Sequence, residues 1–422
     1  MVRSQRTLWL VILISVGPFL LMFIAGFASA ADFALRDGDT VVFLGDSITA
    51  AQTYGKVIEN YTLLRFPDRK VRFINAGRGG DTAAGGLARL ETDVFDRGAT
   101  VLTVAYGFND IGWGIKADAE HRQKYIDSIQ EIVRRCREKN VRVFICSAAI
   151  TAEDPDKAEQ GFFQAMCDDG LSAAKELGGG TIDVQRSMRE IQRRIVAANL
   201  HLQQKEAPHT LHVADGVHLN DLGQLAMAFA ILKGLGAPAE VSSAVIDAEK
   251  SSVLEATGCQ LDQVAMQEGV LRFDRLDAGL PINFGLFGAL QFRFVPIPDQ
   301  LNRYLLTVKN LPDGKYEVLA DGRKLSTYTS GQLAAGVNIS SVTADAWEPG
   351  GPWDAQASAL KHLTDARTEL HLSQVQSHAF LPDDQHRAKL AADAAKINAG
   401  LEDLQRQAAG PRKYRFEVRP VK

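Results

Sequence analysis

Two short segments, far apart in the chain, carry the residue types that acyl transfer to a serine requires. Residues 43–49 read FLGDSIT, so an apolar stretch ends at a glycine and is followed by Asp46 and Ser47. Residues 215–218 read DGVH, which places Asp215 three positions before His218. A serine hydroxyl is a weak nucleophile unless a base removes its proton, and a histidine base needs an acceptor that orients its ring. We therefore predict Ser47 as nucleophile, His218 as base and Asp215 as the orienting carboxylate.

Two further segments could stabilise the oxyanion that such a reaction creates. Residues 75–82 read NAGRGGDT, and glycines there let backbone N–H groups approach a reacting oxygen without a Cβ in the way. Residues 107–110 read GFND, in which Asn109 could donate its side-chain N–H to the same oxygen. Ser47 alone could equally be a helix N-cap, because Ser and Asp are preferred at that position. The four segments together favour the catalytic interpretation.

The elements that must position these residues are short, β-branched apolar runs, most of which come shortly before a polar segment. Such runs alternate with amphipathic stretches between residues 40 and 236, which is typical of a parallel sheet covered by helices. The runs span residues 41–44, 71–74, 101–104, 141–145 and 181–184. We therefore predict a three-layer α/β/α domain with a five-stranded parallel sheet. Since ligands bind beyond the carboxyl ends of such strands, the polar segments should converge on one edge.

Helices are expected between these strands, at residues 118–139, after Asp154 and after Asn220, where caps or apolar spacing support them. Beyond Ala237 the pattern changes to short strands and turns. Strands are expected at residues 271–273, 290–294, 304–308 and 316–319, two helices within 353–408 with a break near 381–382, and a terminal strand at 414–418 that docks on one of the sheets. The predicted divisions are 1–30, 31–237, 238–345 (β-rich) and 346–422 (helical, ending in a strand).

The N-terminal residues have the order of a secretion signal. Arg3 and Arg6 precede an almost wholly apolar run over residues 8–27, and residues 28–30 read ASA. This order matches a charged n-region, an apolar core and a small-residue cleavage site, so we expect a cleaved signal peptide and a secreted, periplasmic or cell-surface protein. The run is close to the roughly 20 residues that span a bilayer, so an uncleaved anchor is the alternative.

The four polar segments resemble the sequence blocks of the SGNH hydrolase superfamily, also called the GDSL esterases and lipases. The blocks Gly-Asp-Ser, Gly before Asp-Thr, Gly-x-Asn-Asp and Asp-x-x-His occur in the family's order, over roughly residues 38–236. The resemblance implies a flavodoxin-like SGNH fold and a carboxylic ester hydrolase. It also implies that Ser47, Asp215 and His218 are the catalytic triad.

The same resemblance implies an oxyanion hole made by the backbone N–H groups of Ser47 and Gly80 and by the Asn109 amide. Gly79 is the alternative to Gly80, because two glycines precede Asp-Thr in this chain. Ile48 stands where the family's nickname has a leucine. The implied chemistry is two-step acyl transfer without any cofactor or metal.

The substrate is less well defined by the sequence. A secreted SGNH domain with a β-rich appendage resembles esterases that remove acetyl groups from polysaccharides, so a small ester or an acetylated polysaccharide is the expected partner. A lipase or phospholipase-type acylhydrolase is the first alternative. A non-catalytic glycan-binding surface protein on a hydrolase fold is the second. The formal net charge of −4 gives no reason to expect nucleic acid, or a membrane beyond the possible anchor.

Several other residues have an open role. Arg78, Phe108 and Trp113 could line the acyl or alcohol pocket or could simply pack. His209 and His212 lie near His218, but no neighbouring Cys or carboxylate has metal-ligand spacing, so we expect no metal. Four cysteines are few for a secreted chain, and a bridge between Cys136 and Cys146 is possible but not required.

Overall fold

The computed structural model describes residues 33–203, 206–283, 288, 290–341, 350–378, 380–381 and 383–421. The predicted signal peptide or anchor, residues 1–30, lies outside these ranges. Within them, no helix is both long and apolar enough to cross a bilayer.

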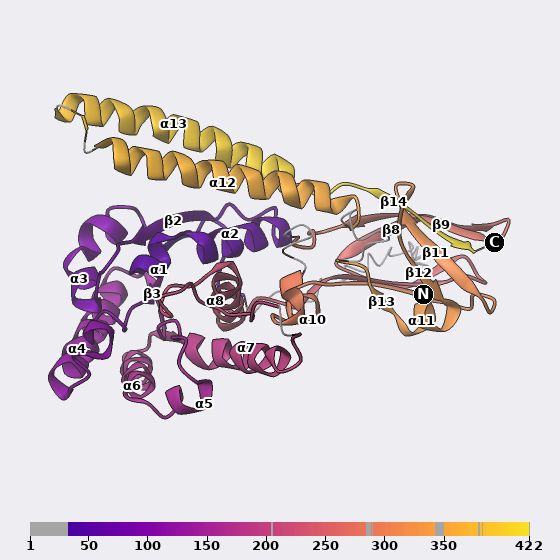
Figure 1. Ribbon diagram of the computed structural model, residues 1–422. Coiled ribbons are helices and arrows are strands. Elements are labelled where there is room, and N and C mark those ends of the chain that lie inside the picture. The colour runs from indigo at the N-terminus through magenta and orange to yellow at the C-terminus, as the bar shows by residue number, and fades with distance from the viewer. Residues whose placement is uncertain are drawn as a thin grey trace, which may run out of the picture.

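The α/β domain is built on a five-stranded parallel sheet, as predicted (Figure 1). Its strand order is β2 (Arg72–Gly77), β1 (Thr40–Gly45), β3 (Val101–Ala105), β4 (Arg142–Cys146) and β5 (Gly180–Ile182). Each neighbouring pair is parallel. The predicted fifth strand was too long, because Asp183 caps α7 (Val184–Asn199) instead of extending the sheet.

Two hydrophobic cores lie on opposite faces of this sheet. Along β1, Val41 and Phe43 belong to one core, whereas Val42 and Leu44 belong to the other, as the alternation of strand side chains requires. The first core is covered by α2 (Thr53–Arg65), α7 and α8 (Asp221–Gly234). The second is covered by α3 (Ala83–Ala88), α4 (Ala119–Glu138) and α6 (Phe162–Glu176). The continuous apolar character of the strands follows from burial on both faces.

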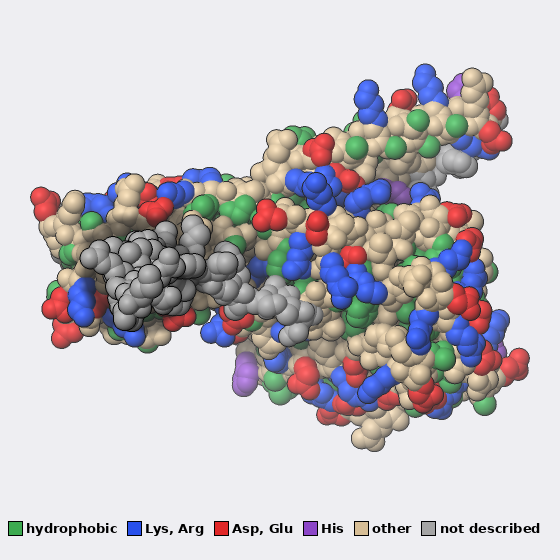
Figure 2. Space-filling model, turned by 180° about the vertical axis from the view of Figure 1, so that it is seen from behind, with side chains coloured by type: hydrophobic (Ala, Val, Ile, Leu, Met, Phe, Trp, Pro, Cys, Tyr) green, Lys and Arg blue, Asp and Glu red, His purple; other side chains and the backbone are tan. Residues whose placement is uncertain are grey.

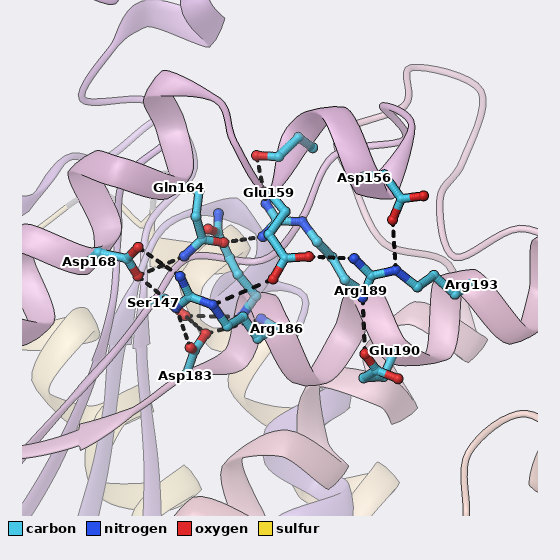
Figure 3. A network of polar contacts seen from close by, with 12 residues as sticks. Ser147, Asp156, Glu159, Gln164, Asp168, Asp183, Arg186, Arg189, Glu190 and Arg193 are labelled. Carbon is cyan, nitrogen blue, oxygen red and sulfur yellow. Dashed lines mark hydrogen bonds and ion pairs between the residues drawn. The ribbon is translucent and has the colours of Figure 1, made fainter.

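A network of ion pairs joins the helices that follow β4 and β5 (Figure 3). Arg186 of α7 pairs with Asp168 of α6 at 2.7 Å and with Asp183 at 2.6 Å. Arg193 pairs with Asp156 of α5 (Pro155–Ala158) at 2.9 Å, and also with Glu159. Single exposed pairs of this kind contribute little stability, but a shared network fixes the relative positions of α5, α6 and α7.

The β-rich region contains two sheets. One has the order β13 (Val337–Asn338), β10 (Arg303–Lys309), β6 (Glu240–Asp247) and β7 (Ser252–Thr257). The other has the order β12 (Arg323–Thr329), β11 (Lys315–Ala320), β14 (Tyr414–Pro420), β9 (Val270–Asp277) and β8 (Cys259–Gln267). The terminal strand β14 thus lies between β9 and β11. The prediction of a strand at residues 290–294 was wrong. Residues Leu290–Arg293 form a 3₁₀ turn, and Leu290 is 58% exposed.

A helical hairpin connects this region back to the α/β domain. It consists of α12 (Trp353–His378) and α13 (Asp384–Ala409), which run alongside α2 and β2 (Figure 1). At its base, Thr364 donates to Asn60 of α2 at 2.6 Å. Arg367 pairs with the buried Glu59 of α2. The hairpin is therefore fixed to the domain by buried polar contacts near the β-rich end.

The first prediction concerns Trp353, which is 0% exposed and packs against Tyr304, Tyr414 and Phe416 where α12 begins. Because truncation leaves a cavity, Trp353→Ala should lower the free energy of unfolding by about 3–5 kcal/mol. Urea denaturation measures this loss. Phe380→Ala is the matched control, since Phe380 is 87% exposed and its removal should change stability by less than about 0.5 kcal/mol. Equal effects of the two substitutions would contradict the structural role of Trp353.

Candidate active site

Ser47, His218 and Asp215 form a continuous chain of hydrogen bonds. The Ser47 Oγ lies 2.8 Å from the His218 Nε2. The His218 Nδ1 lies 2.6 Å from the Asp215 Oδ2. The hydrogen bond with His218, together with backbone N–H groups, lowers the pKa of Asp215 to about 2. The carboxylate is therefore ionised at neutral pH and holds a proton on Nδ1, which leaves Nε2 free to accept the serine proton.

The loop that carries Asp215 and His218 is held by its own hydrogen bonds. The Asp215 Oδ1 accepts the backbone N–H groups of Val217 and His218, at 2.8 and 2.9 Å. Asn220 caps α8 and donates its side-chain N–H to Thr210 O at 2.7 Å. These contacts fix the approach of the histidine to the sheet edge before any substrate arrives.

This loop is also tied to the segment that follows β4. The His212 Nε2 lies 2.9 Å from the Ile150 carbonyl oxygen. The Ala152 N–H donates to the Gly216 carbonyl oxygen at 2.8 Å. Burial lowers the pKa of His212, so its neutral ring can serve as a structural donor. The other neighbouring histidine, His209, contacts Arg293 and Phe294. Neither belongs to a cluster of potential metal ligands within the described ranges.

Ser47 is positioned by the tight turn from β1 into α1 (Ser47–Ala50). The Asp46 side chain caps this helix by accepting the Ile48 N–H at 2.9 Å. Gly77, at the end of β2, lies so close to the backbone of Ala50 that a Cβ there would clash. Asp46 is itself buried, which raises its pKa to about 6. The cap and the glycine together place the serine hydroxyl beyond the carboxyl end of the sheet.

The three predicted oxyanion donors follow β1, β2 and β3, neighbouring parallel strands whose carboxyl ends lie at one edge of the sheet. Ser47 is in the first turn of α1, where a backbone N–H has no partner within the helix. Gly80 has a φ of 72°, a conformation that glycine adopts without a steric penalty. The Asn109 Nδ2 donates to Asp81 O at 3.0 Å, which places this amide beside the Gly80 loop. Its second N–H remains available to an oxyanion, since an amide nitrogen has two protons.

Arg89 was not identified from the sequence, yet it connects two of the four polar segments with Tyr106, the residue that follows β3. Its Nε donates to Asp81 at 2.8 Å, and its Nη2 donates to the Tyr106 hydroxyl at 2.8 Å and to Gly45 O at 3.3 Å. Its Nη1 binds Asp93 at 2.7 Å. The only signal in the sequence was an arginine among the mainly small and apolar residues 83–90, and that pattern has no characteristic motif.

Asp110 joins the third segment to the second. Its Oδ1 accepts the Ala83 N–H at the start of α3, at 3.0 Å. Its Oδ2 is buried and has no hydrogen-bond partner among the described residues. Burial raises the pKa of this carboxyl to about 7, so it is largely protonated at slightly acidic pH. It supports the loop by joining it to the start of α3.

The three residues that were candidates for lining the acyl or alcohol pocket lie in different surroundings. Phe108 lines a cavity of about 20 Å³ beside Asp46 and Val217. The Trp113 ring lies 5.8 Å from the His218 ring and donates its Nε1–H to Asn109 Oδ1 at 2.8 Å. Arg78 is largely exposed, 3.8 Å from Asp93.

All four cysteines are free, and burial raises the pKa of the Cys136 and Cys146 thiols to about 12.

The sequence of this domain has recognisable relatives. Residues 43–226 match the model of the GDSL-like lipase/acylhydrolase family. The match covers the α/β domain, somewhat less than half of the chain. It supports assignment of this domain to the SGNH hydrolase superfamily and a carboxylic ester hydrolase activity. Among curated protein sequences, none matches the chain.

Solved structures share the fold. The chain is similar to the structure described as BT4096, a gut microbial diltiazem-metabolizing enzyme, with 24% identity and a TM-score of 0.75. That match covers 93% of this chain and 100% of the other, so it includes the β-rich region and the hairpin. Axe2, an acetylxylan esterase from Geobacillus stearothermophilus, was matched in a catalytic mutant with 19% identity and a TM-score of 0.40, over 48% of this chain and 96% of the other.

The second prediction concerns Asp110. Its pKa is raised in the folded state, so it stabilises the fold fully below the unfolded-state pKa of about 4 and loses that contribution as the pH rises through about 7. Asp110→Asn keeps the acceptor for Ala83 and cannot ionise. Between pH 5 and pH 8 the native enzyme should therefore lose on the order of 2 kcal/mol more stability than this variant, as measured by urea unfolding.

The control for this measurement is Asp127→Asn on α4, where the carboxylate is exposed. It should follow the native pH dependence. A pH dependence in Asp110→Asn identical to that of the native enzyme would show that Asp110 is ionised throughout this range.

Proposed function

We propose that this enzyme is exported through its N-terminal signal and removes acetyl groups from carbohydrates, using an acyl-enzyme on Ser47. The observation that carries the proposal is the hydrogen-bonded chain from the Ser47 hydroxyl through His218 to Asp215. A small cavity lined by Asp46, Ile48 and Val217, the sequence neighbours of Ser47 and His218, favours a short acyl group. The leader of residues 1–30 supports export.

Acylation begins when the Ser47 Oγ attacks the ester carbonyl carbon and His218 Nε2 takes the hydroxyl proton. The carbonyl oxygen becomes an oxyanion, which accepts hydrogen bonds from Ser47 N–H, Gly80 N–H and the Asn109 amide. The C–O bond to the alcohol then breaks, and His218 returns the proton to the departing alkoxide. The products of this step are a free alcohol and acetyl-Ser47.

Deacylation repeats the same steps with water. His218 removes a proton from the water as its oxygen attacks the acetyl carbonyl, and the same three donors hold the second oxyanion. Collapse breaks the bond to the serine oxygen, which recovers its proton from His218. Asp215 remains ionised throughout and stabilises the imidazolium that forms in each half-reaction.

The acyl group is argued from the size of the cavity. It is bounded by Asp46, Phe108 and Val217, and by the backbone segment after β4, residues 148–151. A volume on the order of 10–15 Å³ is needed to hold one water, so about 20 Å³ accommodates a group of methyl size. An acetyl methyl fits this space, whereas a butyryl or longer chain would need the walls to move.

The alcohol side is more open. Trp113 is 47% exposed at the mouth of the site, beside the His218 ring. An exposed indole at this position offers an apolar face on which a sugar ring can stack. This arrangement supports a carbohydrate alcohol.

The third prediction tests the assigned catalytic residues. Ser47→Ala and His218→Ala should lose nearly all release of acetate and of nitrophenol from nitrophenyl acetate, while circular dichroism shows an intact fold. Asn109→Ala should lower kcat about a hundredfold, because one oxyanion donor is lost. Ser172→Ala, an exposed serine on α6, is the control and should leave kcat unchanged. Native-like rates in Ser47→Ala would refute the assignment.

The fourth prediction tests the acyl cavity. The native enzyme should hydrolyse nitrophenyl acetate at least tenfold faster, by kcat/KM, than nitrophenyl butyrate, because each added methylene must displace packed side chains. Phe108→Ala enlarges the cavity and should reduce this ratio. Trp113→Ala should slow both esters by a similar factor, since Trp113 orients Asn109 and does not line the cavity. A ratio unaffected by Phe108→Ala would place the acyl group elsewhere.

A further inference from the structure

A second, larger cleft begins at the edge of the active site. It has a volume of about 840 Å³ and lies between the edge strand β2, helix α2 and the hairpin of α12 and α13. One end is formed by Gly77 and Arg78, directly before the Gly80 loop. Arg72 lines the other end. Six residues of extended chain separate these arginines, which corresponds to about 20 Å.

The hairpin covers β2 without pairing to it. β2 is at the edge of its sheet, so the outer row of its backbone N–H and C=O groups faces the cleft. On the opposite wall α13 contributes Ala391, Ala394 and Ala395, whose small side chains leave space for a ligand. Figure 2 shows the hairpin standing away from the domain toward its tip, with Lys and Arg side chains along the line where the two meet. Such a channel suits an extended polar chain.

The charges in this cleft are unbalanced. Lys56, Arg89 and Arg367 line it, but each pairs with a carboxylate: Asp365, Asp93 and Glu59, respectively. Arg72 and Arg97 also line the cleft, are exposed, and have no ion pair with any residue in the described ranges. Arg78, at the active-site end, lies 3.8 Å from Asp93 but its side chain is 65% exposed, so three arginines of the cleft are accessible to a ligand.

Among the described residues that line the cleft, the hairpin contributes one carboxylate, Glu402, which pairs with Arg367. The hairpin residue near Arg97 is His371 of α12, and burial together with Arg97 lowers the pKa of this histidine. At neutral pH it is therefore an uncharged hydrogen-bonding group. The carboxylates that line the cleft, Glu59, Asp93 and Glu402, all have arginine partners.

We infer that this cleft binds the chain of an anionic glycan, carrying carboxylate or sulfate groups, whose acetyl ester reaches Ser47. This inference rests on the proposed function. Guanidinium groups bind carboxylate and sulfate oxygens in a bidentate manner, and Arg72 and Arg78 lie about 20 Å apart along β2, so they would contact charged groups on separate sugars of one chain. The edge strand supplies hydrogen bonds to sugar hydroxyls. The β-rich region thereby contributes to substrate binding indirectly, because it anchors the hairpin that forms one wall.

The test compares acetylated polygalacturonate, acetylated dextran sulfate and neutral acetylated xylan of matched acetyl content, with acetate release as the readout. The native enzyme should have the lowest KM for one or both anionic polymers, and this advantage should shrink at high salt. The double variant Arg72→Gln/Arg97→Gln should raise that KM about tenfold, with kcat and nitrophenyl acetate hydrolysis unchanged. The response of the two anionic polymers distinguishes carboxylate from sulfate recognition.

The matched control is Lys124→Gln/Arg134→Gln, which removes two exposed charges from α4. Because α4 covers the opposite face of the sheet from α2, this variant should leave every KM unchanged. Equal KM values for neutral and anionic polymers, or no effect of the Arg72/Arg97 variant, would overturn the cleft inference while leaving the proposed function intact. Turnover of nitrophenyl acetate without release from any acetylated glycan would instead overturn the proposed function. Binding of anionic phospholipid vesicles that is lost in the double variant, without a glycan effect, would assign the cleft to lipid.

Discussion

The hydrogen bond between the Ser47 hydroxyl and the His218 imidazole is the constraint that the α/β domain has to satisfy. Its two partners are 171 residues apart in the chain, so nothing local brings them together. They meet because β1 ends beneath Ser47 and because α8 packs beside α2 on the same face of the sheet. The loop before α8 then needs only short-range hydrogen bonds around Asp215 and Asn220 to direct the imidazole at the serine.

The opposite side of the site depends on a buried arginine. Arg89 binds the end of β1, the Asp81 of the glycine loop and the Tyr106 that follows β3. Removing this charge would leave the Asp81 side chain, which is 9% exposed, without its ion-pair partner, so the geometry of the Gly80 loop depends on a residue outside the predicted catalytic set. Asp110 acts similarly in joining the Asn109 segment to α3, but as a carboxyl whose pKa burial raises to about 7, so that it is largely protonated at slightly acidic pH.

The parts of this fold that followed from the sequence are those governed by local periodicity. The five parallel strands were recognisable because burial on both faces requires apolar, β-branched runs, and α4 and α8 because their apolar residues recur at helical spacing. The strand expected at residues 290–294 failed because its alternating pattern, Leu-Gln-Phe-Arg-Phe, fits a strand and an exposed 3₁₀ turn equally well. Its actual conformation is decided by tertiary packing around Phe294 and Val295.

The residues of the site likewise divide into those that the sequence predicted and those that it did not. Ser47, Gly80, Asn109, Asp215 and His218 lie in short motifs with chemical meaning, and the structure brings them to one edge. Arg89 and the cleft along β2 could not be foreseen, since both depend on which segments meet in space. The position of α12 and α13 against α2, more than 300 residues away in the chain, is determined by buried contacts such as Thr364 with Asn60.

The most direct measurement of the central claim is covalent trapping of the nucleophile. The enzyme would be treated with a fluorophosphonate, digested, and mapped by mass spectrometry alongside the loss of esterase activity. This account predicts one equivalent of label on the peptide that contains Ser47, in step with inactivation, and no label in His218→Ala. Complete inactivation with the label on another residue, or full activity with Ser47 labelled, would contradict it.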